Sequence, residues 1–284
     1  MSDRHSQTDE PELIEDPQER ALAEAKNALR QFDVGMVLLD HWLDTKSRAR
    51  YLRPSDLLTL NRFALEGVNR FAGTFRNVEV TISGSKHQPP RAEDVPALVE
   101  DFCDYVNSNW PHKTALHLAA YALWRINWIH PFADGNGRTA RIISYVILSA
   151  KLGLRLPGTT TIPEQIAADK EPYYSALEAA DVAFLQTRVD VSGLEQLIGS
   201  SLEKQLESSE RASQVYAAEY SSRAVVTPQE LLEKRVEFLE KSLRTYRADR
   251  PISKFIERNP VLFSGFFVLL AAVVGGLLGW FAPH

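Results

Sequence analysis

Apolar residues recur at helical spacing along most of the chain. In residues 18–43 they return every three or four positions, which is the period of an amphipathic helix. The positions that carry this pattern are Leu22, Ala25, Leu29, Phe32, Met36 and Leu39. Comparable spacing predicts further helices over residues 54–73, 93–107, 112–129 and 163–181, and one or two turns over residues 192–199. The pattern therefore predicts an all-α fold.

One short segment departs from the helical period. Residues 78–82 alternate β-branched and other side chains, and Ser83, Gly84 and Ser85 follow as turn formers. Residues 87–90 then close the segment. We expect a small β-hairpin here, standing out from the helices.

The last apolar run is the longest. Residues 261–283 contain no charged side chain, and about 20 such residues suffice to cross a bilayer. We therefore predict a single transmembrane helix over residues 260–283. Ala271, Gly275 and Gly279 repeat every four residues, so this helix could also pair two copies into a homodimer. Lys and Arg precede the run in excess, which predicts by the positive-inside rule that the rest of the chain is cytoplasmic.

Charge is distributed unevenly along the chain. The net charge of −5 equals that of the first twenty residues, which carry seven acids and two bases, and the remainder is balanced. Without a basic surplus, nucleic acid is excluded as an expected partner. Residues 1–19 lack aromatic side chains and are expected to be disordered. The single cysteine, Cys103, cannot form an intramolecular disulfide and is typical of a reducing compartment.

The polar chemistry is concentrated in one stretch between two apolar runs. Residues 130–141 read His-Pro-Phe-Ala-Asp-Gly-Asn-Gly-Arg-Thr-Ala-Arg, and the flanking runs 124–129 and 142–148 predict a helix on each side. Gly135 and Gly137 allow a tight turn whose N–H groups can face an anion, and the positive end of the following helix dipole favours phosphate. A lone His-Pro or Gly-Asn-Gly is more often structural, but here all the polar groups fall within twelve residues.

Each polar side chain of this stretch has a plausible role. His130 can accept a proton near neutral pH, and Asp134 is a hard oxygen ligand for a Mg²⁺ ion that arrives with phosphates. Asn136 can donate an amide N–H to a phosphate oxygen. Arg138 and Arg141 are three residues apart, so both guanidinium groups can bind phosphate oxygens from one helix face. Together these groups predict a site for nucleotidyl or phosphoryl transfer.

The stretch 130–141 resembles the complete signature of the Fic family, also called Fido. The resemblance extends over about residues 50–200 and includes Ala-Gly-Thr-Phe-Arg at 72–76 and Tyr-Tyr-Ser-Ala-Leu at 173–177. It implies an all-helical Fic-type bundle that transfers AMP from ATP to a Ser, Thr or Tyr hydroxyl of a target protein. It also implies His130 as the general base, Asp134 as the Mg²⁺ ligand, and Phe132 as a core anchor.

The same resemblance implies roles for the other site residues. Gly135, Asn136 and Gly137 would hold the α-phosphate, and Arg138 and Arg141 the β- and γ-phosphates. The predicted hairpin corresponds to the Fic flap, on which a target docks by strand addition. Its expected docking residues are Val80, Thr81, Ile82 and Ser83.

Glu66-Gly67 resembles the end of an inhibitory motif, Ser/Thr-x-x-x-Glu-Gly, whose glutamate would pair with Arg141. The Ser/Thr position holds Arg62, however, so Glu66 is equally a structural carboxylate near a helix end. We expect little inhibition from Glu66.

These patterns predict four regions and one principal function. Residues 1–19 form an acidic tail, 20–200 a Fic domain with its N-terminal helix, 201–259 a helical stalk and 260–283 the membrane anchor. The expected partners are ATP with Mg²⁺, a target protein and a lipid bilayer. Two alternatives remain open: a membrane-tethered module that binds a nucleotide without turnover, and a site that transfers another nucleotide or removes AMP.

Overall fold

The computed structural model describes residues 6–7, 13–44, 51–158 and 160–221. Two compact units divide the chain, residues 1–215 and residues 216–284. The predicted span 260–283 and most of the predicted stalk therefore lie outside the described residues. Among the helices of the part that is described, none is long and apolar enough to cross a membrane.

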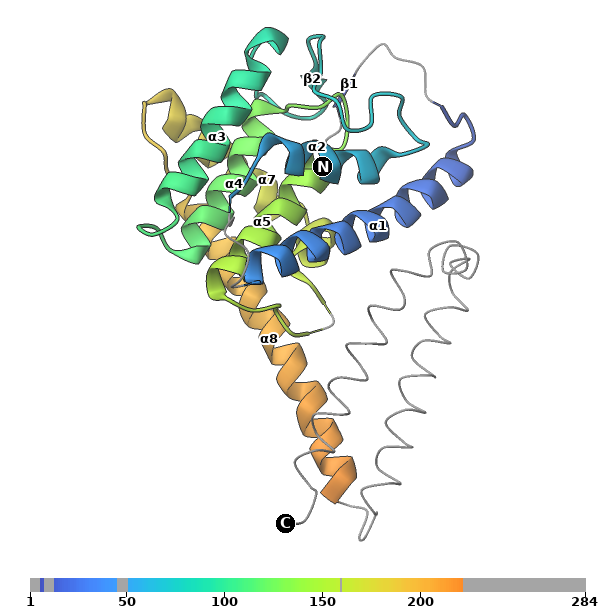
Figure 1. The fold of residues 1–284 in the computed structure, drawn as a ribbon, viewed down its shortest axis with the longest axis vertical. Helices are drawn as coiled ribbons and strands as arrows, with labels where there is room; N and C mark the ends of the chain where they lie inside the picture. Colours follow the sequence, from blue (N-terminus) through green and yellow to red (C-terminus); the bar gives the residue numbers. More distant parts are fainter. Residues whose placement is uncertain (1–5, 8–12, 45–50, 159, 222–284) are drawn as a thin grey trace. The chain divides into compact units, whose positions relative to one another are not determined.

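The described residues confirm the predicted all-α fold (Figure 1). The helices are α1 (Pro17–Leu43), α2 (Pro54–Leu65), α3 (Val95–Asn109), α4 (Ala115–Ile129), α5 (Asn136–Leu152), α6 (Ile162–Ala168), α7 (Glu171–Leu185) and α8 (Ser192–Ser221). A 3₁₀ turn, η1 (Ala92–Asp94), precedes α3. Two short strands, β1 (Ser6–Gln7) and β2 (Thr81–Ile82), pair antiparallel.

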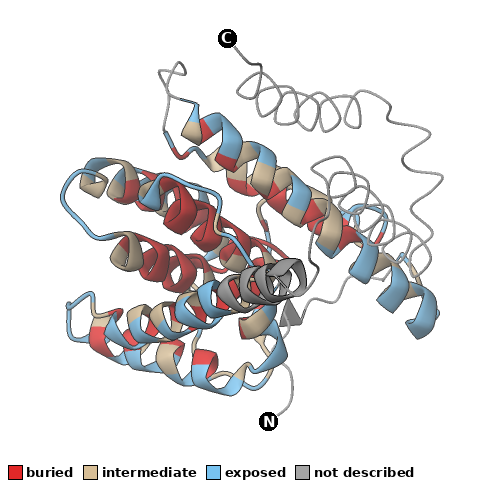
Figure 2. Ribbon diagram, turned by 90° about the horizontal axis from the view of Figure 1, so that it is seen from below, coloured by how far each residue is buried: buried red, intermediate tan, exposed pale blue. Residues whose placement is uncertain are grey.

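The core is built around α4 and α5, which flank the polar stretch. Ten of the fifteen residues of α4 are buried, as are twelve of the seventeen residues of α5. The largest fully buried side chains include Trp124 of α4 and Phe102 of α3. Figure 2 shows this buried interior enclosed by helices whose outer faces are exposed. The loop between α4 and α5 is thus held between two buried, closely packed helices.

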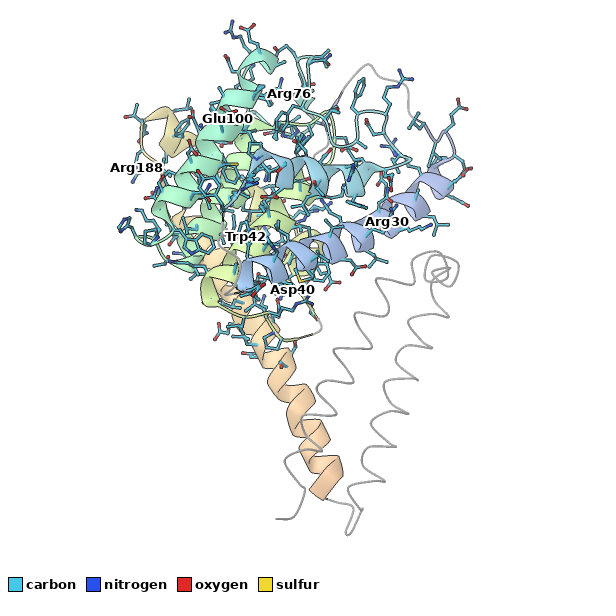
Figure 3. All side chains as sticks on the ribbon, in the orientation of Figure 1. Arg30, Asp40, Trp42, Arg76, Glu100 and Arg188 are labelled. Carbon is cyan, nitrogen blue, oxygen red and sulfur yellow. The ribbon has the colours of Figure 1, made fainter. Side chains whose placement is uncertain are left out.

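Helix α1 crosses α5 at very short range. A Cβ atom at Gly35 would lie 2.6 Å from Cγ2 of Ile142, so only glycine allows the two helices to approach this closely. At the exposed surface Arg155 pairs with Asp40, and the buried Trp42 packs edge-on against Trp110 (Figure 3 labels Asp40 and Trp42). These contacts fix α1 along the central helix pair.

Three helix boundaries differ from the sequence prediction. Helix α2 ends at Leu65 and not near residue 73, because Gly67 turns with a φ of 75° and Asn61 Oδ1 then accepts the N–H of Gly73. The helix expected over residues 163–181 breaks between α6 and α7, where Pro172 has no N–H for the preceding turn.

Helix α8 is longer than the two turns expected over residues 192–199. Nor does the stalk separate from the core at residue 201, since Gln205 is fully buried. Its Nε2 donates to the Tyr145 hydroxyl, and its Oε1 accepts the N–H of Ile162.

The tail expected to be disordered is partly built into the fold. Within residues 1–19, Ser6 and Gln7 form β1, and residues from Pro17 onward belong to α1. Asp16 caps α1 by accepting the N–H groups of Gln18 and Glu19, at 2.9 and 2.8 Å. Asp16, one of the acidic residues of this tail, therefore stabilises the start of α1.

Candidate active site

The polar stretch forms a loop between two left-handed residues. His130 ends α4 with φ 52° and ψ 58°, while its N–H donates to the carbonyl oxygen of Ile126. Gly135, with φ 78°, precedes the first residue of α5. A non-glycine residue in the left-handed region is uncommon and carries local strain, so the position of His130 depends on its surroundings.

His130 is buried, and one hydrogen bond selects a single tautomer of its imidazole ring. Its side chain is 6% exposed, and Nδ1–H donates to the carbonyl oxygen of Asn127 at 3.2 Å. This bond leaves the lone pair on Nε2. Burial lowers the pKa of His130 to about 4, although the bond to Asn127 opposes that shift. The imidazole is therefore neutral at pH 7, which is the form that a general base requires.

Arg76 holds the backbone around His130. Its Nε donates to the carbonyl oxygen of His130 at 2.8 Å, and its N–H donates to the carbonyl oxygen of Pro131 at 2.9 Å. NH1 donates to the carbonyl of Val78, and NH2 to that of Pro90. Figure 3 labels this side chain at the end of the fold where β1 and β2 pair. Burial lowers the pKa of Arg76, and its carbonyl partners compensate the buried charge.

Two asparagines brace the loop from inside. Asn136 accepts the N–H of Phe132 through Oδ1 at 2.9 Å and donates from Nδ2 to the carbonyl of Phe132 at 2.8 Å. Oδ1 and one amide N–H are thus used on the loop, and Asn136 also lines the cavity described below, so its contact with a phosphate oxygen stays a prediction. Asn61 of α2 donates to the carbonyl oxygen of Asp134 at 2.9 Å. Phe132 is fully buried, as expected of a core anchor.

The start of α5 offers first-turn N–H groups at one end of the site. The first-turn N–H groups of a helix have no carbonyl one turn earlier, so they can donate to an anion. Gly137 is helical, and a Cβ there would lie 3.3 Å from NH1 of Arg141, the far end of a flexible side chain that a small shift can move away. Arg138 donates from NH2 to Oδ2 of Asp134 at 3.1 Å, and both side chains are partly exposed.

A single cavity of ≈ 610 Å³ brings these groups together. This volume lies within the usual range for small-molecule sites, about 300–1,000 Å³. The predicted residues that line it are His130, Asp134, Gly135, Asn136, Gly137, Arg138 and Arg141. Tyr173, Tyr174 and Leu177 of α7 also line it, so the Tyr-Tyr-Ser-Ala-Leu segment faces the same space as the loop.

The cavity also includes titratable residues from outside the loop, and all of them except His87 were missed from the sequence. Arg20 and Glu24 of α1 line it, together with His87, Lys170 and Asp181. Oε1 of Glu24 lies 3.1 Å from Nε of Arg20, and Oε2 lies 3.9 Å from NH1 of Arg138. The i, i+4 spacing of Arg20 and Glu24 reveals a pair on one helix face, but nothing local shows that this face meets the loop.

Glu66 is not among the residues that line this cavity. It ends α2 with a half-exposed side chain, and its Oε2 lies 2.6 Å from NH2 of Arg30 (Figure 3 labels Arg30 on α1). Its backbone carbonyl accepts a bond from Asn27, also on α1. These contacts tie α2 to α1, which is the structural role weighed against inhibition.

The predicted β-hairpin is wrong. Residues 78–82 do not pair with residues 87–90, where Pro89 and Pro90 have no N–H to offer. Instead β2 pairs with β1, with Ser6 opposite Ile82 and Gln7 opposite Thr81. Val80 is buried, so of the four expected docking residues its side chain is not available at the surface. His87 Nε2–H donates to the carbonyl oxygen of Trp128 at 2.8 Å and fastens the returning segment to α4.

The residues present fit a Mg²⁺ ion only if phosphate oxygens also bind that ion. No group of three or more His, Cys, Asp or Glu within the described ranges could hold a metal ion. Asp134 is a single carboxylate, 27% exposed, at the cavity wall. One carboxylate is sufficient where phosphate oxygens and water complete the Mg²⁺ shell.

Comparison with known proteins finds similarity in the part of the chain that contains the loop between α4 and α5. Residues 51–148 match the Fic/DOC family. Over 97 residues the chain is 39% identical to the protein adenylyltransferase Fic of Drosophila persimilis and 38% identical to that of Drosophila melanogaster. Each match covers 33% of this chain, but only 18% and 19% of the two relatives. The chain thus spans less than a fifth of the length of these curated relatives.

Solved structures share the fold at low identity. Fic-1 from C. elegans is 21% identical, with a TM-score of 0.55 over 72% of this chain and 55% of that one. A Fic-domain signalling protein from Bacteroides thetaiotaomicron is 22% identical, with a TM-score of 0.52 over 64% and 70%. Residues 51–148 of this chain therefore match the Fic/DOC family in sequence, within a helical fold that resembles solved Fic proteins.

Proposed function

We propose that the chain transfers AMP from ATP to a hydroxyl side chain of a target protein. The observation that carries this proposal is the shared cavity, in which a neutral buried imidazole faces the N-terminus of α5 with its two arginines. The names of the relatives, protein adenylyltransferases, support the same reaction.

The acceptor end of the reaction depends on His130. A target hydroxyl gives its proton to Nε2, and its oxygen attacks the α-phosphorus. The new O–P bond forms as the bond from the α-phosphorus to the bridging oxygen of the β-phosphate breaks, and pyrophosphate leaves. Nδ1 stays bonded to Asn127, so that hydrogen bond stabilises the imidazolium that forms.

The phosphate end depends on α5. Its first-turn N–H groups and the guanidinium groups of Arg138 and Arg141 are positioned to balance the charge of the triphosphate. Asp134 would hold Mg²⁺, which when bound supplies charge neutralisation to the leaving pyrophosphate. Asp134 also accepts a hydrogen bond from Arg138, so the two groups pair with each other.

The proposal is tested by offering the purified full chain a cell lysate with each of the four ribonucleoside triphosphates, labelled at the α-phosphate. We expect ATP to label lysate proteins and the other three nucleotides to label them much less. A matched chain with Lys204→Ala, an exposed position on α8, controls for handling.

The remaining results identify the alternatives. Nucleotide binding without labelled protein would favour a binding module, and preferential labelling from another nucleotide would favour a different nucleotidyl donor. Loss of AMP from proteins labelled beforehand would favour removal as the principal reaction.

A further inference from the structure

One edge of β2, a strand at the rim of the cavity, is already occupied by the chain itself. β2 has one pairing partner among the described residues, and that partner is β1, from the N-terminal segment. The pairing is antiparallel, with Ser6 opposite Ile82 and Gln7 opposite Thr81. Figure 1 shows the two strands next to each other at one end of the fold.

β2 belongs to the rim of the cavity. Ile82, Ser85 and His87 line the same space as His130. The segment that carries them is fastened at both ends, by Arg76 to the carbonyls of Val78 and Pro90 and by His87 to the carbonyl of Trp128. The strand edge therefore keeps a fixed position relative to the catalytic loop.

Pairing at a strand edge uses backbone groups, so it does not depend on the sequence of the partner. An extended segment that pairs along this same edge of β2 must use the N–H and C=O groups that β1 now uses. A two-residue ladder is weak by itself. The N-terminal segment is tethered, however, because the chain is fixed again at Asp16, the N-cap of α1. A short tether holds a segment at an effective concentration of about a millimolar.

We propose that the N-terminal segment around Ser6–Gln7 is an intramolecular competitor for the edge of β2, where it excludes extended segments of other proteins. The claim that this segment occupies the edge does not depend on the proposed AMP transfer. Its effect on target modification rests on the proposed function.

The test compares three full-length proteins: the wild type, Ser6→Pro/Gln7→Pro, and Ser6→Ala/Gln7→Ala. The proline pair removes both N–H groups of β1 and so blocks the ladder whichever of them donates. The alanine pair keeps both N–H groups and is the matched control. Both pairs of substitutions lie far from the helical core, so we expect equal melting temperatures for all three proteins.

Two measurements need no nucleotide. Hydrogen exchange at Thr81 and Ile82 should be faster in the proline variant than in the wild type and the alanine variant. A fluorescent peptide of residues 1–12 should bind the proline variant about two- to tenfold more tightly than the wild type, given the millimolar effective concentration of the tethered segment. The same peptide with proline at positions 6 and 7 should bind neither protein.

Equal exchange in all three proteins would overturn the proposal, as would equal peptide affinity or a proline effect that alanine reproduces. Transfer of labelled AMP to lysate proteins is measured separately. If exchange and peptide binding respond as expected but transfer by an active enzyme does not rise in the proline variant, the competition with targets is wrong. If no variant transfers AMP, the proposed function fails while the occupancy of the edge stands.

Discussion

His130 is kept neutral by burial in a position that only its neighbours maintain. The residue sits in the left-handed region, and its side chain and carbonyl are fixed by Asn127 and Arg76. Because burial lowers its pKa to about 4, the imidazole carries no proton throughout the neutral range. A base of this kind is ready at any physiological pH.

The first prediction concerns the pH dependence of transfer. With a folded-state pKa of about 4, the fraction of His130 in the basic form, and with it kcat/KM, should be level from pH 5.5 to 7.5 and fall only as pH approaches 4. An exposed histidine would give a midpoint near pH 6.5 instead. Initial rates of labelled AMP transfer across this range decide the matter, and a half-maximal rate near pH 6.5 would contradict the assignment.

The same pKa shift bears on stability. The unfolded chain binds a proton at His130 below about pH 6.5, whereas the folded chain binds it only below about 4. The free energy of unfolding should therefore fall as pH drops through this window. His130→Ala should remove that part of the pH dependence, about 3 kcal/mol at most.

Arg76 supplies the second prediction, because it acts on His130 through the backbone and is a positioning residue. Arg76→Lys keeps the charge but cannot reach the carbonyls of His130, Val78 and Pro90 together. We expect kcat for transfer to fall by up to about a hundredfold, as for a catalytic group displaced by about 1 Å, with little change in the KM for ATP.

Arg91→Lys is the matched control, since Arg91 is exposed and pairs with the nearby acids Glu93 and Asp94. Steady-state kinetics of both variants distinguish a displaced His130 from a general loss of protein stability. A rise in KM with unchanged kcat would show that Arg76 serves nucleotide binding instead.

At the scale of elements, α1 matters more to the site than its distance along the sequence suggests. It crosses α5 at Gly35 and brings Arg20 and Glu24 to the cavity wall, where Glu24 faces Arg138. The sequence predicted α1 almost to the residue, because its apolar period is regular. It could not predict which face meets the loop, because that depends on packing between segments about a hundred residues apart.

The third prediction follows from this carboxylate. Glu24 competes with an incoming triphosphate for Arg138, so Glu24→Ala should tighten ATP binding about three- to tenfold, as expected for removing one partly exposed like charge. Calorimetric titration with ATP and Mg²⁺ measures the change. Glu19→Ala, exposed on the same helix, should leave the affinity unaltered. Unchanged or weaker binding in Glu24→Ala would show that this carboxylate does not oppose phosphate.

The loop between α4 and α5 was predictable for a physical reason. Its chemistry lies in twelve consecutive residues between two apolar helices, so local sequence suffices to assemble it. The residues that support it come from afar: Asn61 from α2, Arg76 from the following loop and His87 from the segment after β2. The hairpin was mispredicted because local alternation cannot reveal that residues 6–7 supply the pairing strand.

At the scale of the whole molecule, the site sits in a helical unit that ends with residue 215. The apolar run 261–283 belongs to the remainder of the chain and is known from its sequence alone. We propose that it anchors the enzyme in a bilayer with the site on the cytoplasmic side.

The fourth prediction tests this anchor. The full chain should sediment with membranes and resist a high-salt wash, because an apolar helix is held by hydrophobic burial and not by charge. The matched variant carries Leu269→Arg and Val274→Arg, which place two charges within the apolar run at a cost of about 3 kcal/mol each. It should remain in the supernatant and keep its ATP binding. Release of the full chain by salt alone would contradict a spanning helix.

The central claim is that this cavity transfers the α-phosphoryl group of ATP with its nucleoside attached. The most direct measurement incubates the full chain and a protein lysate with Mg²⁺ and ATP labelled at either the α- or the γ-phosphate. We expect protein label from the α-position only, and at least a hundredfold loss of it in His130→Ala, as for a missing general base. His130→Ala should still bind ATP. Label from the γ-position, or near-normal transfer by His130→Ala, would contradict the account.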